Sequence, residues 1–144
     1  MAPNFEKYVQ DGNRFVNEIA TELGLSDDRS KAYRILKSVL HVLRDKISPQ
    51  ESLQMIAQLP MFIKAVYVDG WKLNEKGRKL RSIDDFVNAV TEVDGMRAYF
   101  DLTRPGEAEN AVRVVFKVLQ RHVSEGEISD IVAILPKELR SLFV

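Results

Sequence analysis

Four basic side chains recur along one stretch of the chain at a spacing that suits binding. Arg34, Lys37, His41 and Arg44 follow one another at intervals of three, four and three residues, so on a helix they share one face. A row of Lys and Arg side chains can contact phosphate groups or the carboxylates of an acidic partner. The row, called the basic stripe below, is therefore a candidate binding site, although such runs more often form only a solvated helix face.

A second group of bases lies in the segment 72–81, where Glu75 is the only acid and the bases are Lys72, Lys76, Arg78, Lys79 and Arg81. The whole chain has 21 acidic and 21 basic residues, which excludes the globally basic composition typical of nucleic-acid-binding domains. Asp27, Asp28 and Asp45 also lie on or beside the helix of the basic stripe, and salt screens charges beyond about 8 Å. We therefore interpret 72–81 as a solvated connector and do not expect nucleic acid as a partner.

The only tryptophan of the chain closes the segment Tyr67-Val68-Asp69-Gly70-Trp71. Tyr67 and Trp71 are candidates for an aromatic anchor that binds a partner or ligand, because aromatic residues dominate binding hot spots. A structural role is the stronger interpretation. Gly70 would end a helix in a left-handed turn, and Trp71 would then pack at the junction between the two halves of the chain.

The remaining polar residues match no catalytic or metal-binding pattern. His41 and His122 have no second histidine three or four residues away, so neither fits a zinc motif, and we interpret both as partly exposed imidazoles. Glu51 and Glu127 each follow a serine by three residues, the spacing of a capping box, and no acidic pair remains for acid–base catalysis. There is no cysteine, phosphate loop or nucleophile elbow. We predict no enzymatic activity, metal or cofactor.

The elements that would position these residues occur twice. Residues 32–68 align with 108–144 at a shift of 76, and the identical apolar pairs include Val39/Val115, Val42/Val118, Leu43/Leu119 and Leu59/Leu135. A unit that cannot bury its apolar face alone can bury it against its copy. We therefore expect these eight positions in the core.

Helical periodicity predicts helices throughout, and no segment alternates as a strand would. The first helix is expected over 5–23, with a bend or break at Asp11-Gly12. Later helices are expected up to about 46, from 48 to 59, over 61–68 and, at the end of the repeat, over 137–143. The largest departure from the repeat is 94–107, which is five residues longer than the matching stretch.

We predict one all-α domain over 1–144, in which two tandem four-helix units related by internal duplication pack as one pseudo-twofold helical bundle. Unit one spans about 4–71, the basic connector 72–81 and unit two 82–144. This length suits a single domain. No apolar run approaches the ~20 residues needed to cross a bilayer, and the first residues do not look like a secretory signal. We therefore expect a cytoplasmic protein without membrane contact.

Two short segments carry a family resemblance: Ala57-Gln58-Leu59-Pro60-Met61 and Tyr67-Val68-Asp69-Gly70-Trp71. Together with the helix 32–47 and the opening Asp85-Phe86-Val87 of unit two, they resemble a prokaryotic family catalogued as domain of unknown function 2267. The resemblance covers nearly the whole chain. It implies a bacterial, cytoplasmic, all-helical protein, and it supplies no catalytic residue, cofactor or partner.

Three functional hypotheses follow from these patterns. The leading one is a non-enzymatic interaction or regulatory module that binds a protein partner or forms a homo-oligomer. The second is binding of nucleic acid or an acidic partner through the basic stripe and the connector. The third is a small-ligand or enzymatic site between the two units, where pockets often form.

Overall fold

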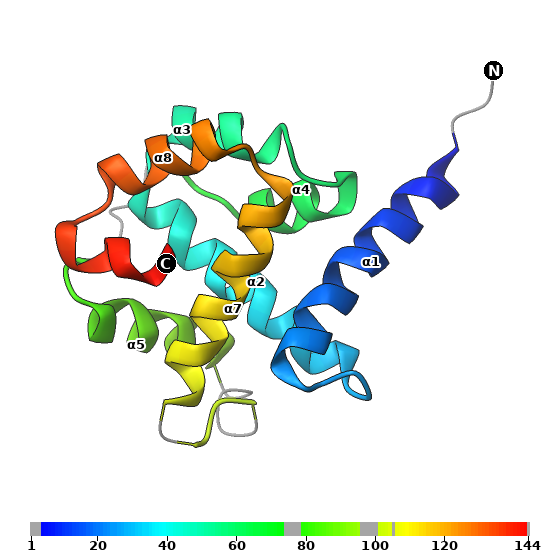
Figure 1. The fold of residues 1–144 in the computed structure, drawn as a ribbon, viewed down its shortest axis with the longest axis horizontal. Coiled ribbons are helices and arrows are strands. Elements are labelled where there is room, and N and C mark those ends of the chain that lie inside the picture. Colours follow the sequence, from blue (N-terminus) through cyan, green and yellow to red (C-terminus); the bar gives the residue numbers. More distant parts are fainter. Residues whose placement is uncertain (1–3, 74–78, 96–100, 105, 144) are drawn as a thin grey trace.

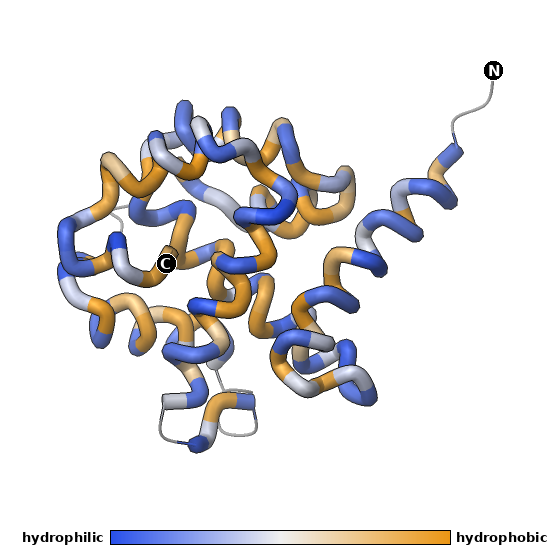
Figure 2. The backbone as a smooth tube through the Cα atoms, in the orientation of Figure 1, coloured by the Kyte–Doolittle hydropathy of each residue, from blue (hydrophilic) through white to orange (hydrophobic). Residues whose placement is uncertain are grey.

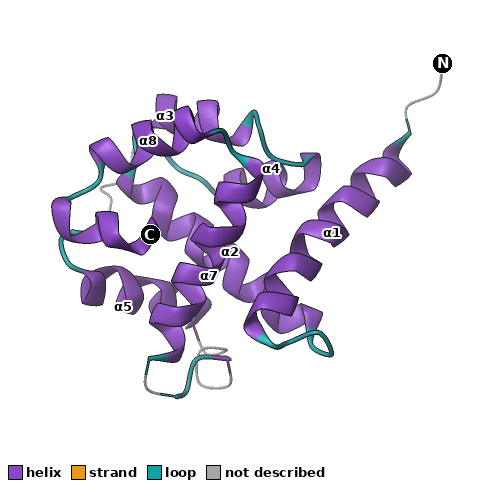
Figure 3. Ribbon diagram, in the orientation of Figure 1, coloured by secondary structure: helices purple, strands orange, loops and turns teal. Residues whose placement is uncertain are grey.

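The computed structural model describes residues 4–73, 79–95, 101–104 and 106–143, and these residues are helical without any strand (Figures 1 and 3). This confirms the predicted all-α class. In chain order the helices are α1 (Phe5–Leu23), α2 (Arg29–Lys46), α3 (Pro49–Ile56), α4 (Met61–Val68), α5 (Ile83–Asp94), α7 (Glu107–His122), α8 (Glu125–Ile134) and the 3-10 helix η2 (Lys137–Phe143). None of the described helices is both long and apolar enough to cross a membrane.

Helix α1 runs without a break through Asp11-Gly12, so the break that the sequence allowed at this point does not occur. Gly12 is buried against α4, and a Cβ atom at Gly12 would lie only 3.3 Å from the Cβ of Phe62. The glycine therefore permits a close approach of two helices instead of ending one. The first half of α1 projects from the body of the protein (Figure 1). The helix ends at Leu23, and the next residue, Gly24, has a left-handed φ of 71°.

Helix α2 passes through the middle of the body and packs against α1, α4, α5 and α7. Its start is capped by Asp28, whose carboxylate accepts the backbone N–H of Lys31 at 3.1 Å. Its apolar stripe is wide because neighbours lie on several sides. The eight repeated positions predicted to be core are all buried, with at most 4% exposure: Val39, Val42, Leu43, Leu59, Val115, Val118, Leu119 and Leu135.

Apolar segments turn toward one another inside the body, while hydrophilic segments lie outside (Figure 2). In the C-terminal half, Phe116 lies between two other rings: Phe143 is stacked on it with centroids 4.1 Å apart, and Phe86 meets it edge-on at 5.7 Å. Such offset and edge contacts are favourable arrangements of aromatic pairs. They fix α5, α7 and η2 around one small aromatic cluster.

Helices α3 and α8 start with serine caps, but they lack the complete capping boxes predicted for them. The side chains of Ser48 and Ser124 accept the backbone N–H of Glu51 and Glu127 at 3.1 and 3.2 Å. The reciprocal bond from the acid is present at Ser82, where the Asp85 carboxylate accepts the serine N–H, and it does not appear for either glutamate. The capping role assigned to the two glutamate side chains is therefore wrong, because α3 and α8 pack together and bring these carboxyl groups to each other.

Candidate functional site

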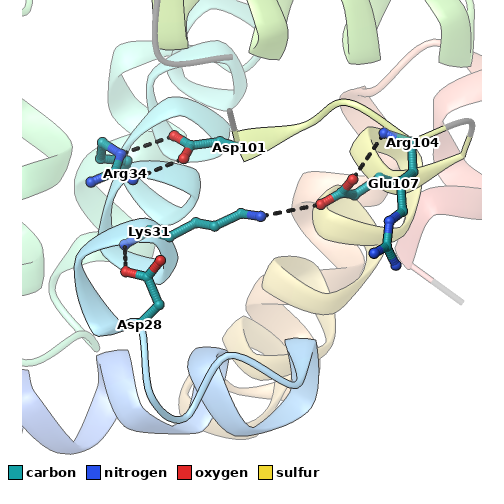
Figure 4. A network of polar contacts seen from close by, with 6 residues as sticks. All are labelled: Asp28, Lys31, Arg34, Asp101, Arg104 and Glu107. Carbon is teal, nitrogen blue, oxygen red and sulfur yellow. Dashed lines mark hydrogen bonds and ion pairs between the residues drawn. The ribbon is translucent and has the colours of Figure 1, made fainter. Parts of the chain in front are cut away.

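The first residue of the basic stripe forms an ion pair inside the protein. Arg34 donates from Nε and Nη2 to the two carboxylate oxygens of Asp101, at 2.9 and 2.8 Å. The Asp101 side chain is 1% exposed, and the Arg34 guanidinium lowers its pKa below the ordinary value. Figure 4 shows this pair beside a second contact between the same parts of the chain, in which Lys31 Nζ lies 3.4 Å from Glu107. The first contact joins α2 to the chain before α7, and the second joins α2 to the first residue of α7.

Two further stripe residues bind the C-terminal end of α4. Arg44 donates to the backbone carbonyls of Tyr67 and Asp69 at 2.6 and 2.8 Å, and Nε2 of His41 lies 2.7 Å from the carbonyl of Val66. The last carbonyls of a helix have no partner within the helix, so these side chains cap α4. Burial, followed by nearby bases, lowers the pKa of His41, which favours a neutral imidazole that donates from Nε2 to the carbonyl.

The other basic candidates lie at the surface or outside the described residues. Lys37 Nζ is 3.4 Å from the exposed carboxylate of Asp69, a contact of the kind that contributes little to stability. The described connector residues Lys72, Lys79 and Arg81 are exposed, whereas the candidates Lys76 and Arg78 lie outside the described residues. The role of the whole basic patch in binding stays a prediction.

The two residues of the candidate aromatic anchor pack against the body. Tyr67 is fully buried, its hydroxyl shares a 2.6 Å hydrogen bond with that of Ser52, and burial raises its pKa. Trp71 is half-buried and meets Tyr67 edge-on at 5.6 Å, with the Arg44 guanidinium 5.9 Å from the indole centroid. Gly70 adopts a φ of 67°, as predicted for a left-handed turn. Both of these contacts of Trp71 lie within the first half of the chain.

His122 joins α7 to α1. Its Nε2 lies 2.9 Å from the carboxylate of Glu18, and its ring packs on Phe15 at 4.8 Å. Arg121 also binds Glu18 and Glu22 of α1. A hollow of about 250 Å³ beside these residues lies between α1 and α7, where the two halves of the chain meet. Three of its charged residues, Glu18, Glu22 and Arg121, are engaged with one another, which makes this region a polar helix–helix contact.

Three acids that the sequence analysis did not bring together meet where α3 packs on α8. One carboxylate oxygen each of Glu51, Glu127 and Asp130 lies within 4.8 Å of the others; this group is called the carboxylate cluster below. Glu127 is 7% exposed, and Oε1 of Glu51 and of Glu127 are buried without a hydrogen-bond partner. Burial, and then the neighbouring Glu51, raise the pKa of Glu127 to about 7. The signal available in the sequence was that Glu51 and Glu127 occupy equivalent positions of the predicted repeat, 76 residues apart.

A second site that the sequence did not reveal lies beside the projecting half of α1. Phe5 and Val9 are exposed there, as are Phe62 of α4 and Tyr33 of α2. Next to them is a shallow groove of about 150 Å³, called the α1–α4 groove below, lined chiefly by Val9, Val16, Tyr33, Phe62 and Val66. An open hollow of about 460 Å³ continues from it past Tyr33 toward Arg29 and Arg34. An apolar row beside a groove is typical of a protein-binding surface.

The fold and these sites define a small all-helical protein whose surface features are helix faces and grooves. The chain belongs to the family described as "Uncharacterized conserved protein (DUF2267)", whose model matches residues 12–142. This match confirms the family resemblance found in the sequence. The exposed residues Phe5 and Val9 precede the matched region. A comparison with curated proteins found no match.

Proposed function

We propose that this protein is a non-enzymatic interaction module that associates with a second copy of itself through α1 and the α1–α4 groove. The observation that carries the proposal is the position of Phe5 and Val9, which are 64% and 42% exposed on a helix that projects from the body. Exposed apolar rows of this kind mark interaction surfaces in folded proteins. The groove beside them supplies a complementary concave surface.

The second copy is the preferred partner because α1 carries both halves of a helix–helix interface. In an antiparallel pair of α1 helices centred on Val9, Phe5 of each copy would face the region of Asn13 in the other, where the groove lies. The same register would place Lys7 opposite Asp11, so opposite charges would meet at the rim. A contact in which the same patch serves both copies is the common twofold arrangement of homodimers.

Sedimentation velocity over a range of protein concentrations tests this proposal. The wild-type protein is expected to dimerise, and Phe5→Ser with Val9→Ser is expected to shift it to monomer. Leu53→Ser is the matched control, because Leu53 is 61% exposed on α3 and outside the groove. A wild-type protein that remains monomeric up to roughly 0.1 mM, a concentration that would reveal any dimer of moderate affinity, would overturn the proposal.

We also propose that the described helices form two duplicated units that pack about a pseudo-twofold axis. The helix contacts come in corresponding pairs: α1 packs on α2 and α7, while α5 packs on α7 and α2. Arg44 donates to the Tyr67 carbonyl, and 76 residues later Gln120 donates to the Phe143 carbonyl at 2.9 Å.

Two pairs of residues related by the same shift of 76 also meet each other, namely Lys31 with Glu107 and Glu51 with Glu127. Counterparts meet one another at a twofold axis. These contacts support an arrangement in which neither unit buries its apolar face without the other. Unfolding of a fragment of residues 1–81 tests this arrangement.

A further inference from the structure

The carboxylate cluster places three acids within 4.8 Å of one another, and no basic side chain of the described residues forms an ion pair with them. Oε1 of Glu127 and Oε1 of Glu51 are buried without hydrogen-bond partners, and the ion pairs of the described residues include neither glutamate nor Asp130. A buried carboxylate without a partner is costly, and three acids close together add mutual repulsion. A cation bound between the three carboxyl groups would reduce both costs.

The local structure does not already supply that charge. Both glutamates lie in the first turns of their helices, where the helix dipole favours a negative side chain. The dipole does not provide a hydrogen bond to Oε1 of Glu51 or of Glu127, which both lack a partner. The backbone N–H groups of these two glutamates already donate to the hydroxyls of Ser48 and Ser124. The backbone N–H of Ser124 is also occupied, since it donates to Gln58 at 2.7 Å.

We propose that Glu51, Glu127 and Asp130 form a binding site for a divalent cation, with calcium as the preferred ion. Carboxylate oxygens are the ligands of hard cations such as calcium, magnesium and manganese. Glu127, nine-tenths buried with an unpartnered oxygen, forms the inner wall of the site. Asp130 is exposed and Glu51 half-buried, so an ion can enter from solvent and keep water on its outer side.

The chemistry of the ligands favours calcium over magnesium. Calcium accepts six to eight oxygens in a flexible arrangement, with bonds of about 2.3–2.6 Å, whereas magnesium demands a near-ideal octahedron with bonds of about 2.0–2.1 Å and gives up its waters reluctantly. Three carboxylate oxygens within 4.8 Å of one another, carried by side chains of two helices, suit the flexible site and leave its other positions to water. The ion would bridge α3 and α8, two helices from opposite halves of the chain, and would thereby stabilise their contact.

Calorimetric titration of the full chain, stripped with EDTA, tests the site with calcium chloride and magnesium chloride as probes. We expect calcium to bind with a dissociation constant of about 10⁻⁵–10⁻³ M, as in sites with few protein ligands, and to raise the melting temperature as its concentration exceeds that value. Magnesium should bind at least roughly tenfold more weakly because of its stricter geometry. Glu127→Gln should abolish the calcium response, and Asp130→Asn should weaken binding by roughly tenfold or more.

Glu125→Gln is the matched control, because Glu125 is an exposed acid in the same first turn of α8 that lies outside the cluster. It removes the same charge and should leave calcium binding unchanged. The exposed position of Asp130 keeps the test valid should Glu127→Gln fail to fold. Absence of calcium binding at millimolar concentration, or a response that both cluster variants retain, would overturn the site, and tighter binding of magnesium would overturn the assignment to calcium.

Discussion

Arg34 of α2 holds Asp101 in a two-point ion pair, with Nε and Nη2 at 2.9 and 2.8 Å from the two carboxylate oxygens. Asp101 belongs to 94–107, the stretch that has no full counterpart in the predicted repeat. Its side chain is buried, and Arg34 is partly exposed. The pair therefore fastens the described part of this stretch to the central helix, and a residue of the basic stripe serves the fold.

Replacing Arg34 should destabilise the protein. Arg34→Met leaves the Asp101 carboxylate buried without the cation that pairs with it, and we expect the free energy of unfolding to fall by about 2–3 kcal/mol, below the roughly 3–5 kcal/mol typical of a fully buried pair. Urea unfolding measures this change. Arg14→Met is the control. Arg14 is exposed, and its ion pair with Asp11 is long, at 3.5 Å, so the loss of this pair should lower the free energy of unfolding by less than about 1 kcal/mol. Equal losses in the two variants would contradict the role of Arg34.

The same pair predicts a dependence on pH. The pKa of Asp101 is lowered in the folded protein, first by the hydrogen bonds from Arg34. The unfolded chain therefore binds the proton more readily, and stability falls as the pH decreases. The contribution is complete above the unfolded pKa of about 3.9 and is lost as the pH falls through the lower folded pKa. Asp101→Asn should remove this part of the acid sensitivity in urea unfolding between about pH 2 and 5; parallel curves for the two proteins would contradict it.

The cap that Arg44 forms on the end of α4 can be tested by replacing Arg44 with glutamine, the residue type that makes the corresponding bond at position 120. Arg44→Gln should lower the free energy of unfolding by about 1 kcal/mol or less, because Gln120 binds the Phe143 carbonyl from the equivalent position. Arg44→Leu should cost more, about 1–3 kcal/mol, because the carbonyl of Tyr67 then loses a side-chain donor. Chemical unfolding of both variants measures the difference. A glutamine variant as unstable as the leucine variant would show that charge, and not capping, matters.

Nucleic-acid binding through the basic stripe is expected to be weak or absent at physiological salt. The net charge is zero, and Arg34, His41 and Arg44 are engaged with groups of the same chain. Fluorescence anisotropy with labelled duplex and single-stranded probes measures affinity against salt, where each phosphate contact with duplex DNA adds roughly 0.9 to the slope. The comparison variant combines Arg34→Gln, Lys37→Gln and Arg44→Gln, with its stability measured alongside. Sub-micromolar, salt-sensitive binding that this variant loses would restore the nucleic-acid hypothesis.

A fragment of residues 1–81 should not fold cooperatively. Helix α2 packs on α5 and α7, so removing the second half exposes buried positions such as Val39 and Leu43. Burial of such side chains stabilises a fold by about 1.5–3 kcal/mol each, and a fragment of this length has little stability to lose. Circular dichroism during urea unfolding of the fragment and of the full chain provides the measurement. A sigmoidal transition in the fragment would contradict mutual burial of the two halves.

The sequence by itself determined the helices and most of the core, because the signals for both are local. The repeated apolar spacing of α2 and α7 predicts their buried faces, and Ser48, Ser82 and Ser124 mark helix starts wherever those helices lie in the fold. Gly12 shows the limit of local signals. Judged from the sequence alone, a glycine within a helical pattern indicates a possible break. In the structure α4 approaches α1 closely at Gly12, so this glycine has a packing role.

Only the tertiary structure decided which of these residues are exposed and which meet. Phe5 and Val9 have the same helical spacing as buried residues. They are exposed because the first half of α1 projects from the body of the protein, where none of the described helices buries these two side chains (Figure 1). Glu51 and Glu127 have a capping spacing in the sequence, but the packing of α3 on α8 joins their carboxyl groups across 76 residues of chain. Periodicity and capping depend on neighbours within a few residues, whereas exposure and charge pairing depend on how distant helices pack.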